Sequence, residues 1–92
     1  MRPTTQQKQK IIVAIPTLNR PEYLNLTIKS VAEQATRHHH DVEIVVSDVS
    51  QGRKPKTNRP FAEINEDLIK RMKKKFINIL IHYYGPGEVE LI

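Results

Sequence analysis

The chain has 92 residues, of which 15 are Lys or Arg and 10 are Asp or Glu, so its formal net charge is +5. This length fits one domain with a modest core, and the charge favours an anionic partner: a nucleotide diphosphate, nucleic acid or an acidic membrane surface. The sequence contains no cysteine, which excludes disulfides and thiolate metal sites and is compatible with a reducing compartment. No apolar run approaches the roughly 20 residues that cross a bilayer, so we expect a soluble, cytoplasmic protein without a membrane span.

The first strand is predicted to follow a polar lead-in. Residues 1–10 contain three glutamines and little that can pack, so we expect them to be disordered and residues 11–92 to form a single α/β domain. The continuous apolar run from Ile11 to Ile15 is typical of a strand that is buried on both faces in a parallel sheet. Pro16 is expected to end the ladder, because proline has no N–H to donate.

The first helix is predicted to run from Pro21 to about Gln34. Apolar residues then recur at helical spacing, beginning with Leu24 and Ile28. Proline suits a first helical turn, where its missing N–H would have had no partner. A polar loop over residues 36–41 follows.

The second strand is predicted over Val42–Ser47, where β-branched residues dominate. Like the first strand, it ends in a polar turn, which includes Asp48 and Gly52. The stretch Arg53–Pro60 carries four basic residues and two prolines, and we expect an extended, mobile loop there.

A second helix and a third strand complete the pattern. Ile64, Leu68, Met72 and Phe76 recur every four residues and predict a helix over residues 61–76. A third strand is predicted over residues 77–83. A Gly-Pro-Gly turn follows at residues 85–87, and residues 89–92 could start another strand.

These elements predict an α/β fold, a Rossmann-like β-α-β-α-β unit with a mainly parallel sheet in two or three layers and right-handed connections. In such a sheet the polar turns that follow the first two strands meet at one edge, where open α/β folds bind ligands. The far face of three short strands needs cover, so the chain looks like the first half of something larger.

Two segments carry a family resemblance. Residues 12–24 read IVAIPTLNRPEYL and continue with TIKSV at 27–31 and Gln34, and residues 43–50 read EIVVSDVS. Together they resemble the opening of family 2-type glycosyltransferases with the GT-A fold, which have an (I/V)PTYNR-like turn, a helix of the form YLxxTIxSVxxQ and an EIIVVDDGS segment. The match is good over residues 11–50 and remains collinear to about residue 84.

The resemblance implies a nucleotide-binding half of a GT-A fold whose ligand is a nucleotide sugar, most simply a UDP-sugar. It places Pro16, Thr17 and Asn19 near the base and ribose, with Arg20 close by. Asp48 matches the second Asp of the family's DDGS segment, which usually accepts a hydrogen bond from the uracil N–H. A carboxylate oxygen is a suitable acceptor for such a group. The alternative role for Asp48 is that of a carboxylate that caps its own turn.

Departures from the family pattern limit what the chain can do. Ser47 replaces the first Asp of the pair, and Val49 replaces a glycine in the turn. The Asp-x-Asp motif that binds Mn²⁺ or Mg²⁺ in the family is absent, so no metal or catalytic residue is assigned, and a divalent cofactor is implied only for a longer form. The family resemblance implies an inverting glycosyltransferase, but we expect this chain to be inactive as it stands.

Two further classes of function remain open. A noncatalytic α/β module would use the same half-sheet to pair with another chain, as a homo- or hetero-oligomer that completes the sheet. The basic residues also suit a nucleic-acid-binding domain, although the few aromatic residues offer no stacking platform. The run His38–His40 is expected to be a solvated loop, since three adjacent histidines rarely converge on one ion.

Overall fold

The computed structural model describes residues 10–89 and shows a small α/β domain with a three-stranded parallel sheet. The elements along the chain are β1 (Lys10–Thr17), α1 (Pro21–Arg37), β2 (Asp41–Asp48), α2 (Phe61–Lys75), β3 (Leu80–Tyr84) and the short α3 (Pro86–Val89). The predicted β-α-β-α-β order is therefore confirmed. The disordered lead-in predicted for residues 1–10 lies outside the described residues except for Lys10, which begins β1. The strand suggested for residues 89–92 also lies outside them except for Val89, which ends α3.

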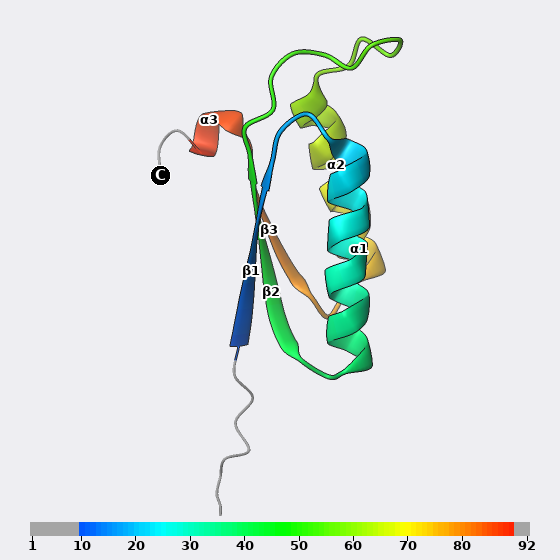
Figure 1. Ribbon diagram of the computed structural model, residues 1–92, viewed down its shortest axis with the longest axis vertical. Coiled ribbons are helices and arrows are strands. Elements are labelled where there is room, and N and C mark those ends of the chain that lie inside the picture. Colours follow the sequence, from blue (N-terminus) through cyan, green and yellow to red (C-terminus); the bar gives the residue numbers. More distant parts are fainter. Residues whose placement is uncertain (1–9, 90–92) are drawn as a thin grey trace, which may run out of the picture.

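The sheet has the order β1-β2-β3, and both neighbouring pairs are parallel. Figure 1 shows α1 and α2 side by side on one face of the sheet, and the short α3 on the other side of it. The described residues thus form two main layers. This arrangement places the ends of β1 and β2, with the turns that follow them, at one edge of the sheet.

The hydrophobic core lies between the two long helices and the inner face of the sheet. Along β2, buried side chains alternate with half-buried ones, so only one face of the strand is fully covered. The prediction that the strands are buried on both faces is wrong for the described residues, because Ile12 is 63% exposed on the outer face. The core comprises Ile15, Leu24, Ile28, Ala32, Ala35, Val42, Ile44, Val46, Leu68, Ile69, Met72, Ile79 and Ile81.

Pro16 does not end β1, contrary to the prediction from its missing N–H. The pairing with β2 continues through Pro16 opposite Ser47 and Thr17 opposite Asp48. The carbonyl oxygen of Thr17 accepts a hydrogen bond from the Val49 N–H, so the Thr17 backbone faces β2. Backbone groups of alternate residues point to opposite sides of a strand, and the nitrogen of Pro16 therefore faces the free edge of the sheet. No ladder hydrogen bond is lost there.

Both helices differ from the predicted ones at their C-terminal ends. The first helix continues past Gln34 to Arg37, and the N–H of His38 closes it by donating to the Gln34 carbonyl. The second ends at Lys75, with Phe76 as its C-cap. The third strand begins at Leu80 instead of at residue 77, because the chain needs residues 76–79 to turn back from α2 toward the sheet.

The basic stretch between β2 and α2 projects from the body of the domain, as Figure 1 shows, and it is held by hydrogen bonds within the segment. Arg53 forms an isolated antiparallel bridge with Pro60, and the N–H of Lys54 donates to the Arg59 carbonyl at 2.8 Å. The guanidinium of Arg53 donates to the Asn58 carbonyl, also at 2.8 Å. These hydrogen bonds give partners to backbone groups that lie outside the helices and strands. Within residues 10–89, no helix has both the length and the apolar character needed to cross a membrane.

Candidate functional site

The turns that follow β1 and β2 are joined by two reciprocal hydrogen bonds. The N–H of Asn19 donates to the Ser50 hydroxyl oxygen at 2.8 Å, and the N–H of Gln51 donates to Oδ1 of Asn19 at 2.8 Å. Asn19 adopts a left-handed conformation with φ = 51°. Asparagine tolerates this conformation better than most residues do, and its side chain can then bond the neighbouring backbone. The two loops are thus held together at the carboxyl ends of the strands, and we call the surface that they form there the edge.

Asp48 anchors this edge from inside the fold. It is 0% exposed, and its carboxylate accepts hydrogen bonds from three donors. Oδ1 accepts from the Ser50 N–H at 2.8 Å, while Oδ2 accepts from Nδ2 of Asn65 at 3.1 Å and from the Tyr83 hydroxyl at 2.6 Å. A buried carboxylate needs such donors, because they replace the water it has lost.

Asn65 and Tyr83 bring α2 and β3 into the same network. Asn65 is 0% exposed, and its Nδ2 also lies 3.2 Å from the Ser50 hydroxyl oxygen. Its Oδ1 is a buried oxygen that lacks a hydrogen-bond partner among the described residues. Burial, together with the hydrogen bond to Asp48, raises the pKa of the Tyr83 hydroxyl far above its usual value, so this donor keeps its proton at any physiological pH.

The residues predicted to contact a nucleotide separate into an exposed and a buried set. Pro16, Asn19 and Arg20 are exposed at the edge, whereas Thr17 is 7% exposed and Asp48 is fully buried. The structure therefore gathers all five at the same end of the sheet. A ligand N–H can reach the Asp48 carboxylate only after one of its present donors has moved.

Only some of the nearby cations are free to attract an anionic ligand. In the turn before α2, Lys54 pairs with Glu22 at 2.7 Å, and Arg59 pairs with Glu63 and Asp67 at 2.6 and 2.7 Å. Arg20 takes part in no ion pair among the described residues; its guanidinium lies over the Tyr23 ring, 5.3 Å from the centroid. Arg20 is therefore one cation that a phosphate group could use; Arg53 and Lys56, in the turn before α2, also make no ion pair among the described residues.

The described residues show no cluster of three or more histidine, cysteine or carboxylate side chains that could hold a metal ion. His38, His39 and His40 are exposed where α1 ends, as expected for a solvated loop. The rings of His38 and His40 lie 5.9 Å apart between centroids, tilted by 39°. This geometry is a contact between neighbouring rings at the surface.

Sequence reasoning missed Asn65 and Tyr83 as parts of the network. Asn65 had a detectable signal, because it shares the buried face of α2 with Leu68, Ile69 and Met72. A polar residue within an apolar helical stripe needs a buried partner. The spacing of Asp48 and Ser50 is likewise typical of an Asx-turn, in which a carboxylate accepts from the N–H two residues later. Tyr83 had no such signal, because its partner depends on where β3 docks.

Comparisons of the chain with protein-family models, with curated protein sequences and with solved structures give no match. The resemblance to glycosyltransferases therefore depends on the sequence motifs alone.

Proposed function

We propose that this chain is a nucleotide-binding half-domain of the glycosyltransferase type and that its ligand is a nucleotide sugar, most simply a UDP-sugar. The observation that carries the proposal is the pair of hydrogen bonds between Asn19 and the Ser50–Gln51 turn. These bonds join the two segments that resemble the family, at the edge of a parallel sheet where α/β folds bind ligands.

In this proposal the nucleoside lies against the exposed edge of the turn that follows β1. Pro16 and Asn19 offer the surface for the base and ribose, and Arg20 offers a cation for the diphosphate. Asp48 does not contact the nucleoside directly in this proposal, because its two oxygens already accept hydrogen bonds from Ser50, Asn65 and Tyr83. It holds the Ser50 turn in place and thereby sets the shape of the edge.

The proposal covers binding and does not extend to sugar transfer. A divalent cation that neutralises the leaving diphosphate belongs to a longer form of such an enzyme, in which transfer would proceed by displacement at the anomeric carbon. In this proposal residues 10–89 supply the protein surface for the nucleoside and, with Arg20, a cation for its phosphates.

The test is a proton–nitrogen NMR titration of the chain with UDP and, separately, with GDP, each with Mg²⁺. We expect shifts that cluster at Thr17, Asn19 and Ser50 for one nucleotide and thereby identify the base. Arg20→Ala should weaken that response severalfold, whereas Lys29→Ala, which removes an exposed cation from α1, should not. A well-dispersed spectrum that is unmoved by nucleotide at about 1 mM, the weak end of biological affinities, would overturn the proposal.

A second candidate function is supported by the outer face of the sheet. Ile12 is 63% exposed, Leu80 is 59% exposed and Tyr84 is 37% exposed, all on strands whose other side packs on the helices. On the same face Glu43, which lies between Ile12 and Leu80, pairs with Lys10 and His82, so the exposed apolar side chains flank a charged centre. Exposed apolar side chains around such a centre suit a partner surface that is itself partly polar. We infer that the half-sheet pairs with another chain through this face, independently of any nucleotide.

The second candidate is tested by multi-angle light scattering of the wild type and of Leu80→Lys. Leu80 is exposed, so the substitution should preserve the fold, which circular dichroism verifies. A concentration-dependent increase in mass that Leu80→Lys abolishes would support self-association through the face. Monomers of both proteins at every concentration would argue against a homo-oligomer.

A further inference from the structure

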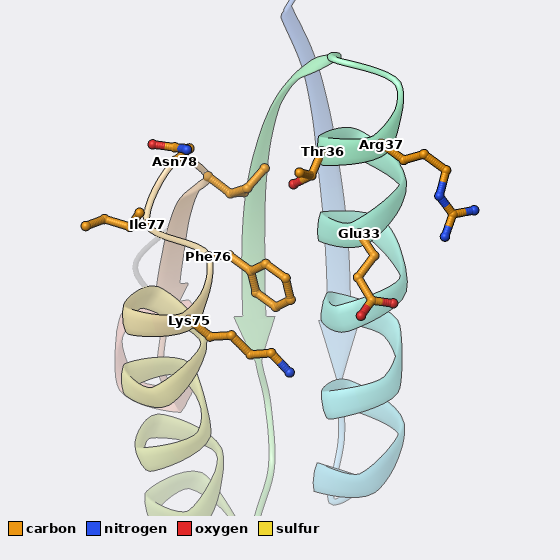
Figure 2. Close-up of a pocket in the computed structure, with 8 residues that line it drawn as sticks. Glu33, Thr36, Arg37, Lys75, Phe76, Ile77 and Asn78 are labelled. Carbon is orange, nitrogen blue, oxygen red and sulfur yellow. The ribbon is translucent and has the colours of Figure 1, made fainter.

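A pocket of about 470 Å³ lies between the C-terminal ends of α1 and α2, at the opposite end of the strands from the candidate nucleotide site (Figure 2). Figure 2 shows the Phe76 ring pointing into the space between the two helices. Phe76 is half-buried and packs against the hydrophobic core, and Ile79 beside it is 9% exposed. The pocket therefore has an apolar floor, and the ammonium of Lys75 lies over the Phe76 ring, 5.5 Å from its centroid.

The lining of this pocket carries two basic residues and one acidic residue. Arg37 from α1 and Lys75 from α2 line it, and neither takes part in an ion pair among the described residues. Figure 2 shows that the Arg37 side chain extends away from the space between the helices, so Lys75 is the cation closest to the Phe76 ring. Lys73 and Lys74 precede Lys75 in the same helical turn. The acidic residue of the lining is Glu33, on α1. The local charge is therefore positive, with one carboxylate at a defined position on one wall.

The apolar surface continues beyond the pocket. Ile77 follows Phe76 and is 83% exposed, more than any other large apolar side chain of the described residues. Figure 2 shows that its side chain points away from the space between the helices. A small molecule held between the helices would leave Ile77 in water. An extended chain that crosses residues 76–78 would cover both Phe76 and Ile77.

We propose that this pocket docks a short acidic segment of a partner protein. One aromatic or aliphatic side chain of the segment packs on Phe76 beside the Lys75 ammonium, the flanking chain covers Ile77, and its carboxylates face Lys75. Charge complementarity selects an acidic segment, since positive surface attracts it and speeds its encounter. Glu33 repels the same carboxylates and so weakens binding. The proposal does not depend on nucleotide binding, which would use the other end of the strands.

The experiment measures fluorescence anisotropy of a short labelled peptide in which one phenylalanine is flanked on both sides by glutamates. Two control peptides replace the glutamates by glutamines or the phenylalanine by alanine. We expect the first peptide to bind best and its affinity to fall with added salt. Lys75→Glu should weaken binding by about three- to tenfold, and Ile77→Ser should weaken it severalfold.

Two further variants separate this pocket from general attraction to a basic protein. Glu33→Gln should strengthen binding by up to about threefold, because it removes the repelling carboxylate. Lys56→Glu makes the same charge change as Lys75→Glu but lies in the turn before α2, so screening should leave its affinity near that of the wild type. These four sites are exposed, and circular dichroism should show an unchanged fold for each variant.

Three results would overturn the proposal. The first is a glutamine peptide that binds as well as the glutamate peptide. The second is equal weakening by Lys56→Glu and Lys75→Glu, which is the behaviour of diffuse attraction to any polyanion, such as nucleic acid or an anionic vesicle. The third is no binding of any peptide at about 1 mM.

Discussion

The hydroxyl of Tyr83 donates a hydrogen bond of 2.6 Å to Oδ2 of Asp48, and this bond joins β3 to the carboxyl end of β2. Tyr83→Phe removes the donor with little change of shape, so we expect the free energy of unfolding to fall by about 1.5–3 kcal/mol, the range for a hydrogen bond to a charged group. Urea denaturation measures the change. Tyr84→Phe is the matched control, since Tyr84 makes no side-chain hydrogen bond within the described residues. Equal midpoints for the two variants would contradict a stabilising role of the bond.

The same substitution distinguishes two roles for Asp48 in nucleotide binding. If Asp48 acts by holding the Ser50 turn, Tyr83→Phe loosens its support and weakens UDP binding by about two- to fivefold, the equivalent of about 0.5–1 kcal/mol. We expect this result because the carboxylate is fully buried. If the base N–H instead bonds to Asp48 directly, removal of a competing donor would strengthen binding. Calorimetric titration with UDP gives the sign, and Tyr84→Phe again serves as the control.

The sequence predicts the order and type of the main elements well because each depends on local patterns. Continuous β-branched runs and apolar residues at helical spacing identify the strands and helices without knowledge of their neighbours. Pro16 misled the prediction because the effect of a missing N–H depends on whether it faces a neighbouring strand or a free edge. The length of β1 therefore could not be read from residues 11–16 alone.

The candidate site was only partly predictable for the same reason. Thr17, Asn19 and Asp48 end neighbouring parallel strands or follow them, so their proximity follows from topology. The donors that complete the network come from α2 and β3, and no short-range pattern links Asp48 to Tyr83. The spacing of Asp48 and Ser50 predicts that Asp48 caps its turn, but the burial of Asp48 and its bonds to Asn65 and Tyr83 depend on distant groups and were visible only in the structure.

Asn65→Asp tests whether the buried network around Asp48 can hold a second carboxylate. The substitution places a second carboxylate beside Asp48 at a position that is 0% exposed, so one of the two must be neutral or remain uncompensated. Burial and the like charge raise the pKa of the pair in the folded state, so the penalty is largest at neutral pH and shrinks as the pH falls and a proton binds. We expect a loss of about 3 kcal/mol or more at pH 7.

Circular dichroism between neutral and mildly acidic pH measures this effect. The variant should gain structure or thermal stability on acidification, whereas Asn65→Leu, which cannot bind a proton, should not. Asn78→Asp makes the same chemical change at an exposed position and should behave like the wild type. If Asn65→Asp and Asn78→Asp were equally stable at pH 7, the site would not be the closed environment described.

Asn19 combines a left-handed backbone with a side-chain hydrogen bond, and two substitutions separate these contributions. Asn19→Gly loses the bond from the Gln51 N–H but adopts φ = 51° without strain. Asn19→Ala loses the bond and also strains the backbone by about 1–2 kcal/mol. We therefore expect the alanine variant to be the less stable of the two by about that amount in urea denaturation. The reverse order would show that the turn relaxes to another conformation.

Arg59 and Asp67 form an ion pair at 2.7 Å on the surface next to the turn before α2, and this pair makes a small part of the stability depend on pH. The hydrogen bond from Arg59 lowers the pKa of Asp67 below its usual value of 3.8. The Asp67 carboxylate therefore binds a proton less readily in the folded state than in the unfolded chain. The contribution is fully present above pH 3.8 and is lost as the pH falls through the lower folded value.

Asp67→Asn removes this contribution, so it should lower Tm slightly at pH 7 and in low salt, and the difference from the wild type should shrink as the pH falls below 3.8. Added salt should reduce the difference at pH 7 as well, because the pair is exposed to solvent. Glu66→Gln is the control: it changes a neighbouring exposed carboxylate that has no ion-pair partner among the described residues. Thermal scans of the three proteins across this range measure the effect, and a gap in Tm that stays constant down to the lowest pH would show that Asp67 acts through packing instead of charge.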